Sequence, residues 1–194
     1  MKKLDLSFRN NEQARRGSLL ISDPFLDDTY FSRSVIILCE HNKDGSFGFV
    51  LNNYLDIEIS KIDENFPNIG ARISFGGPVA KENLFFIHAL GPQIIGSVKV
   101  TDEIYYGGDF DQIRDILTHS VEAREKVRFF IGYSGWSVGQ LEDELNEHSW
   151  IPVNNIDTPV LFNTSDEDLW KHCLEKQGER FKMIAKFPLN PRDN

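Results

Sequence analysis

Cysteine, basic residues and long apolar runs are all scarce in this chain, and each scarcity excludes a class of protein. Only two of the 194 residues are cysteine, Cys39 and Cys173, without a C-x-x-C pair, which excludes a disulfide scaffold. The longest apolar runs, such as 35–39, fall far short of the roughly 20 residues that cross a bilayer. The start of the chain lacks an apolar signal core, so we expect a cytoplasmic protein without a membrane segment.

Negative charge exceeds positive charge, because 30 Asp and Glu residues against 21 Lys and Arg residues give a formal net charge of −9. Contacts with phosphates dominate the affinity of proteins for nucleic acids. An acidic chain without a basic stripe is therefore a poor candidate for direct nucleic-acid binding. Hydrophobic residues make up 40% of the chain, which is enough for a packed core. We expect one domain over residues 1–194, in which residues 1–16 form a polar arm.

Short apolar or alternating runs bounded by Pro, Gly and Asn predict the strands. The clearest run is Val35–Leu38, which is typical of a strand buried on both faces. The turn residues 42–45 join it to an alternating strand in a hairpin. We expect strands at 18–22, 34–40, 46–51, 72–75, 84–90, 127–131, 150–153 and 160–163, with weaker candidates at 97–101 and 104–106.

Three segments have helical periodicity. The first opens at Asp109, the second follows the strand at 127–131 and carries Leu141, and the third runs from Thr164 to Gly178. A short helix is also expected at 59–66. Because hairpins come early and helices late, the sequence predicts an α+β fold with a curled, mostly antiparallel sheet and three main helices.

The segment Gly132–Ser137 (GYSGWS) places two glycines and two serines around a tryptophan, between an expected strand and an expected helix. Glycine permits close approach to the backbone, and the unpaired N–H groups at a helix start could hold an anion. Ser137 and Gln140 also form a capping box that satisfies the same donors within the helix, and we favour this second interpretation. Glu142 could line a cleft beside this turn.

Two groups of residues suggest nucleophiles. Ser134 stands where a nucleophile elbow would place its serine, but the G-x-S-x-G pattern fails because Trp136 replaces the last glycine. At the end of the buried strand, period-2 alternation puts Cys39 and His41 on one face and Glu40 on the other. We interpret Cys39 as a core residue and His41 as a residue that orients the hairpin turn.

Metal and nucleotide sites lack their usual patterns. The five histidines are spread along the chain with no H-x-H or H-x-x-x-H pair, whereas zinc sites usually contain such short spacings. Neither a P-loop nor G-x-G-x-x-G is present. We therefore expect neither a metal nor a cofactor.

Three blocks in order resemble the YqgE/AlgH family of small bacterial proteins: LLISDPFLDDTYFSRSVIILCEHNKDGSFGFVLN, FGGPV followed by LFFIH, and GYSGWSVGQLEDELNEHSW. The resemblance implies an α+β fold whose sheet curls into a pseudo-barrel. The family carries the label of candidate transcriptional regulators, from a link to alginate production, with no settled biochemical activity and no agreed catalytic residues. Many members continue with arginine or lysine and then proline after Leu51-Asn52, whereas this chain has Asn53-Tyr54.

Our leading interpretation is a non-enzymatic regulatory or binding protein that recognises a small ligand or a protein partner at a rim formed by two glycine-containing turns. We expect the turns to meet beside Trp136, which would offer a broad contact surface. The candidate residues are Gly76, Gly77, Pro78, Ser134, Gly135, Trp136, Ser137, Gln140 and Glu142, with Cys39, Glu40, His41 and Asn52 as secondary candidates. A hydrolase that uses Ser134, or Cys39 with His41, is the alternative.

Overall fold

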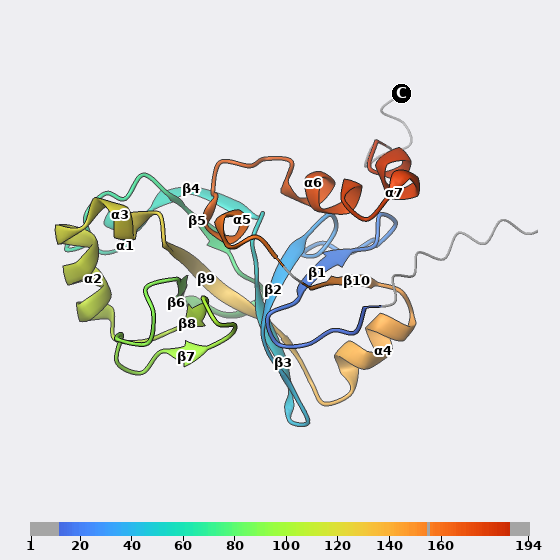
Figure 1. Ribbon diagram of the computed structural model, residues 1–194, viewed down its shortest axis with the longest axis horizontal. Helices are drawn as coiled ribbons and strands as arrows, with labels where there is room; N and C mark the ends of the chain where they lie inside the picture. Colours follow the sequence, from blue (N-terminus) through green and yellow to red (C-terminus); the bar gives the residue numbers. More distant parts are fainter. Residues whose placement is uncertain (1–11, 155, 187–194) are drawn as a thin grey trace, which may run out of the picture.

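The computed structural model describes residues 12–154 and 156–186, which form a ten-stranded, mostly antiparallel sheet with seven short helices (Figure 1). The main strand order is β10-β1-β2-β3-β9-β6-β8-β7, with β5 pairing to both β4 and β9, and the sheet does not close. The predicted α+β fold is confirmed. No helix among the described residues is long and apolar enough to cross a membrane. Residues 1–11 of the expected arm lie outside the described part of the chain.

One half of the sheet is buried on both faces. It contains β1 (Leu19–Ser22), β2 (Val35–Asn42), β3 (Gly45–Val50) and β10 (Trp150–Val153). Alternate side chains enter opposite cores, so Ile37 packs with helices α6 (Leu169–Glu175) and α7 (Glu179–Ile184), while Ile36 packs on the side of α4 (Gln140–Asn146). The burial on both faces that Val35–Leu38 predicts is therefore confirmed.

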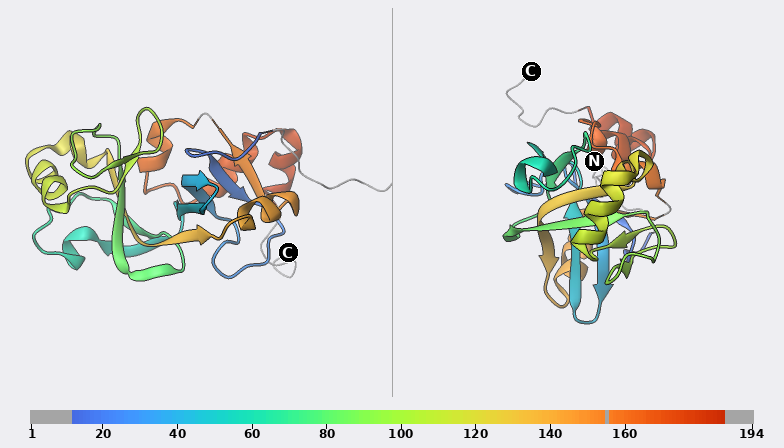
Figure 2. Two further views of the ribbon diagram at one scale, coloured as in Figure 1. Left: turned by 90° about the horizontal axis from the view of Figure 1, so that it is seen from below. Right: turned by 90° about the vertical axis from the view of Figure 1, so that its left-hand side faces the viewer.

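The other half of the sheet carries the remaining strands and its own core. Its strands are β4 (Tyr54–Glu58), β5 (Arg72–Phe75), β6 (Val79–His88), β7 (Val98–Lys99), β8 (Tyr105–Tyr106) and β9 (Val127–Trp136). Its helices are α1 (Ile59–Ile62), α2 (Phe110–His119) and α3 (Val121–Arg124). These three helices lie at one end of the molecule and α4, α6 and α7 at the other (Figures 1 and 2).

Strand β9 belongs to both halves. Its last residues, 134–136, pair with β3, and residues 127–133 pair with β6. Residues 130 and 131 also pair with β5 in parallel orientation. The expected strand at 127–131 therefore continues to Trp136, and the segment expected to turn from strand into helix is the end of a long strand.

Two further expectations about local structure are wrong. Residues 160–163, expected as a strand, lie mainly in helix α5 (Thr158–Phe162), whose first turn contains Pro159. The third main helix begins at Leu169 instead of Thr164, because the oxygens of Thr164 accept hydrogen bonds from Arg72 and do not cap a helix.

Candidate functional site

The two glycine-containing segments lie against each other, but no hollow separates them. The hydroxyl of Ser134 donates a hydrogen bond to the carbonyl oxygen of Gly76 over 2.9 Å. A Cβ atom on Gly77 would lie 2.4 Å from the Ser134 hydroxyl oxygen, and one on Gly132 would lie 2.4 Å from the Gly77 carbonyl oxygen. The expected rim between the two turns is therefore filled by the chain's own backbone, which is the close approach that the glycines permit.

Ser134 is fully buried in strand β9. Its side chain donates to the backbone of Gly76, between β5 and β6, and does not project from a strained turn, as the nucleophile of an elbow must. Cys39 is also fully buried, and burial raises the pKa of its thiol far above the ordinary value. The hydrolase alternative therefore has no exposed nucleophile at either position.

Trp136 is buried, contrary to the expectation that it offers a broad contact surface. Its ring lies against Phe31 and Trp150, with ring centroids 6.5 and 6.0 Å away. Its indole N–H donates to Glu144 over 2.8 Å, and the N–H of Trp150 donates to the same carboxylate oxygen over 2.7 Å. These contacts attach helix α4 to the sheet, so Trp136 has mainly a packing role.

The expected capping box at the start of α4 is formed only in part. The backbone N–H of Ser137 donates to the side-chain oxygen of Gln140 over 3.0 Å, although the helix begins after Gly139. Glu142 is exposed, and its carboxylate lies 3.9 Å from His41 Nε2. His41 Nδ1 lies 2.7 Å from the hydroxyl oxygen of Ser46, across the β2–β3 hairpin, which agrees with a role in orienting the turn.

Two of the secondary candidates, Asn52 and Cys39, contribute to the packing of β2. Asn52 accepts a hydrogen bond from the backbone N–H of Val35 and donates one to the carbonyl oxygen of Arg33, each over 2.8 Å. Cys39 lies where the pairing of β2 with β3 shifts between Leu38 and Glu40. This bulge breaks the simple alternation expected for residues 39–41.

A cleft of about 690 Å³ opens beside the end of the β2–β3 hairpin. The residues that line it, which we call the aromatic cleft, are Glu40, Asn42, Asp44, Gly45, Ser46, Phe47, Phe49, Val79, Phe85, Tyr106, Tyr133, Gly135, Trp136 and Ser137. Four of the predicted site residues are therefore in its lining: Glu40, Gly135, Trp136 and Ser137. The other predicted residues are not among those that line it: Gly76, Gly77, Pro78, Ser134, Gln140, Glu142, Cys39, His41 and Asn52.

Four rings form a closed set of contacts in the wall of the cleft. Phe47 touches Phe49 and Tyr133, with ring centroids 5.8 Å apart in both pairs. Phe85 completes the set, at 5.8 Å from Phe49 and 5.6 Å from Tyr133. Phe49 is buried and the other three are half-buried, so the wall is the open edge of the core beneath α6 and α7. Sequence reasoning missed it because three separate strands supply the rings.

The polar rim of the cleft is acidic. Glu40 accepts a hydrogen bond from the hydroxyl of Tyr106, whose ring stands edge-on to Phe47 with centroids 5.0 Å apart. Burial and the neighbouring Glu40 carboxylate raise the pKa of Tyr106. Asp44 also lines the cleft, whereas none of the described lining residues is basic. The arrangement combines an apolar wall with hydrogen-bond acceptors at its edge.

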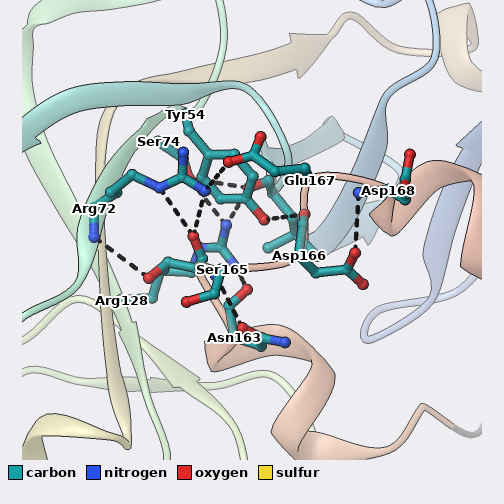
Figure 3. Close-up of polar contacts among 11 residues, drawn as sticks. Tyr54, Arg72, Ser74, Arg128, Asn163, Ser165, Asp166, Glu167 and Asp168 are labelled. Atoms are coloured by element: carbon teal, nitrogen blue, oxygen red, sulfur yellow. Dashed lines mark hydrogen bonds and ion pairs between the residues drawn. The ribbon is translucent and has the colours of Figure 1, made fainter.

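A second polar cluster joins the connection between α5 and α6 to the sheet (Figure 3). Arg128 is fully buried, and its guanidinium donates to the carbonyl oxygens of Leu51 and Leu161 and, over 3.0 Å, to the Ser74 hydroxyl. Burial lowers its pKa to about 10. Sequence reasoning missed this residue, although a single charge inside the apolar run VRFFI was the available signal.

Tyr54 covers two guanidinium groups in the same cluster. The guanidinium carbon of Arg72 lies 4.0 Å from the centroid of its ring, and that of Arg128 lies 5.5 Å away. Arg72 also donates to the carbonyl oxygen of Thr164 over 2.7 Å and pairs with Glu167 at 2.7 Å. Both cations are held by partners within the fold, through both terminal nitrogens of Arg128 and through the carbonyl and carboxylate contacts of Arg72, so the cluster has a structural role.

Comparisons with known proteins give the family. Residues 19–182 match the family model described as AlgH-like. A protein of Cytophaga hutchinsonii, named only as a UPF0301 protein, is 38% identical over 180 residues and covers 92% of this chain and 98% of its own. The solution structure of AlgH from Pseudomonas aeruginosa matches with a TM-score of 0.71 and 23% identity over 93% of this chain and 98% of that one, which shows a shared fold. This chain therefore belongs to the AlgH-like family.

Proposed function

We propose that this protein is a non-enzymatic binding protein that takes a small organic ligand into the aromatic cleft. The observation that carries the proposal is the closed set of four rings around Phe47, three of them half-buried, in a cleft of about 690 Å³. Ligand sites in proteins commonly measure roughly 300–1,000 Å³ and combine apolar walls with a few polar groups. The rings would contact an apolar body, and the acceptors at the rim would orient it.

A regulatory role of such a protein would depend on the ligand and not on contact with DNA. The formal net charge of −9 opposes attraction to phosphates, and the cleft itself has an acidic rim. We therefore place any effect on transcription at an indirect step, in which the ligand-bound protein interacts with another component of the cell.

The hydrolase alternative makes a different prediction. An activated nucleophile at Ser134 or Cys39 would react with fluorophosphonate or iodoacetamide probes while the protein is folded. Both side chains are fully buried, so we expect neither to be labelled before unfolding. Labelling of either residue in the folded protein, mapped by mass spectrometry, would support the alternative.

The binding proposal can be tested with a side chain that fills the cleft. Val79 lines the cleft and is 37% exposed, so Val79→Trp can add a large ring with little effect on the core. Val121→Trp is the matched control, because Val121 is exposed and is not among the lining residues. The readout is an NMR screen with small aromatic compounds, in which the ring protons of Phe47 and Tyr133 report binding.

We expect compounds that shift these ring signals in the wild-type protein and in Val121→Trp, and a loss of the shifts in Val79→Trp. Failure of the whole compound set to affect the two rings would refute the proposal. Shifts that persist in a folded Val79→Trp protein would move the binding site away from the cleft.

A further inference from the structure

We infer that the aromatic cleft selects a ligand with a positively charged ammonium or guanidinium head beside an apolar body, and that Arg16 of the chain itself competes with that head for Glu40. The inference rests on the proposed binding function and adds the chemical class of the ligand. It also assigns a residue outside the cleft to the control of binding.

Glu40 lies beside the aromatic rings of the cleft. The bulge in β2 places Glu40 opposite Phe47 of β3, which belongs to the aromatic wall. The hydroxyl of Tyr106 donates to Oε1 of Glu40 and fixes the carboxylate at the edge of the rings. The side chain of Glu40 is still 29% exposed, so a ligand can reach it from the cleft.

The charged side chains that line the cleft are negative. Glu40 and Asp44 are both acidic, and the described lining residues include no base. An anionic ligand would face two carboxylates and no basic side chain among the described lining residues. A cation would be attracted both by the carboxylates and by the negative faces of the aromatic rings.

The chain itself already places a cation, Arg16, near Glu40. Nη2 of Arg16 lies 3.8 Å from Oε1 of Glu40, which is longer than a hydrogen bond. The side chain of Arg16 is 42% exposed, and Nη1 donates to the carbonyl oxygen of Lys99 over 3.1 Å. Long, exposed ion pairs contribute little stability, so a ligand cation can replace Arg16 at low cost.

The experiment uses three probes with one skeleton: 4-phenylbutylamine, 4-phenylbutanol and 4-phenylbutyrate. Binding is measured by NMR titration and calorimetry at low and high salt. We expect the amine to bind about tenfold more tightly than the carboxylate at low salt, with the alcohol between them, and the difference to shrink as salt screens the charges.

Two substitutions test the roles of the charged residues. Glu40→Gln should remove most of the preference for the amine while the alcohol still binds, because the amide keeps an acceptor for Tyr106 and loses the charge. Arg16→Gln should tighten amine binding about threefold and leave the alcohol unaffected. Glu82→Gln and Arg15→Gln are the matched controls, since both side chains are exposed and neither lines the cleft.

The outcomes separate the two proposals. If none of the three probes shifts the rings of the cleft, the proposed binding function fails. If the alcohol and the carboxylate bind as tightly as the amine, or Glu40→Gln keeps the preference, the charge selectivity is refuted while binding stands. A blocked lysine tripeptide that binds more tightly than the amine would overturn the assignment to a small molecule in favour of a basic peptide.

Discussion

The indole N–H of Trp136 donates a hydrogen bond to Oε2 of Glu144 over 2.8 Å. The indole N–H of Trp150 donates to the same oxygen over 2.7 Å, so a single carboxylate satisfies two buried donors. Trp136 ends β9 and Trp150 begins β10, and Glu144 lies in α4. The carboxylate therefore attaches the helix to two strands that are not neighbours in the sheet.

Replacement of Glu144 by leucine should destabilise the protein strongly. Both indole N–H groups would be buried without an acceptor, at a cost of about 1–3 kcal/mol each, so we expect the free energy of unfolding to fall by about 2–6 kcal/mol. Urea denaturation followed by tryptophan fluorescence measures this loss. Glu147→Leu is the control, because this exposed glutamate lies just after the same helix and should change stability by less than about 0.5 kcal/mol.

Substitution at Gly77 tests the contact between the two glycine-containing segments. Gly77 has a φ of +148°, and an added Cβ would lie 2.4 Å from the Ser134 hydroxyl oxygen and from the Tyr133 carbonyl carbon. Gly70→Ala provides the comparison, since Gly70 also has a positive φ but nothing lies within 4 Å of the added atom.

We expect Gly70→Ala to cost about 1–2 kcal/mol from backbone strain alone, and Gly77→Ala to cost at least about 2 kcal/mol more from the steric clash. Thermal and urea unfolding of the two variants give the difference. Equal losses at the two positions would mean that the segments are free to separate.

Removal of Arg128 tests whether this buried cation is structural. Arg128→Met keeps a long side chain but removes the guanidinium donors, so the carbonyl oxygen of Leu161 loses its donor and that of Leu51 keeps only the Ser74 hydroxyl; we expect a loss of at least about 2 kcal/mol in the free energy of unfolding. Arg128→Lys should also be destabilised, because one ammonium group cannot replace the planar fork of donors. Wild-type stability of either variant in urea would contradict this role.

The stability should decrease in mild acid because of His88. This histidine is fully buried, and burial lowers its pKa from 6.5 to about 4. The unfolded chain binds a proton at His88 below about pH 6.5, whereas the folded chain does so only near pH 4, so acid favours unfolding across this interval. The linked loss amounts to about 3 kcal/mol between pH 6.5 and 4.

His88→Phe isolates this contribution. Phenylalanine can keep the stacking with Tyr105, whose ring lies 5.6 Å from that of His88, and it has no proton to bind. The difference in unfolding free energy between the variant and the wild type should move in favour of the variant as the pH falls from 6.5 to 4. A difference that is constant over this interval would contradict the prediction.

Local patterns predicted much of the fold, and the failures have physical causes. Strands β5 and β10 have the expected bounds because apolar runs meet clear turn signals at both ends. Strand β4 was missed because Asp56 and Glu58 interrupt its short apolar pattern. The short, mostly apolar run at 160–163 predicts a strand where the structure has helix α5, because so short a run does not distinguish the two structures.

The candidate site was less predictable than the fold. The sequence singled out Glu40 and Gly135, which line the cleft, but it placed Glu40 by simple alternation. The bulge that aligns Glu40 with Phe47 depends on the pairing of two strands, which a local pattern does not contain. The ring contacts of Phe47 with Phe49 and Tyr133 likewise require the pairing of β3 with β9.

The sharing of β9 between the two halves has a consequence for attempts to divide the chain. A cut on either side of residues 127–136 leaves one fragment without the strand that pairs with β3, β5 and β6. Halves of the chain that are expressed separately should therefore stay unfolded alone and fold only when they are combined. The same dependence should make the intact chain lose its structure in a single cooperative event.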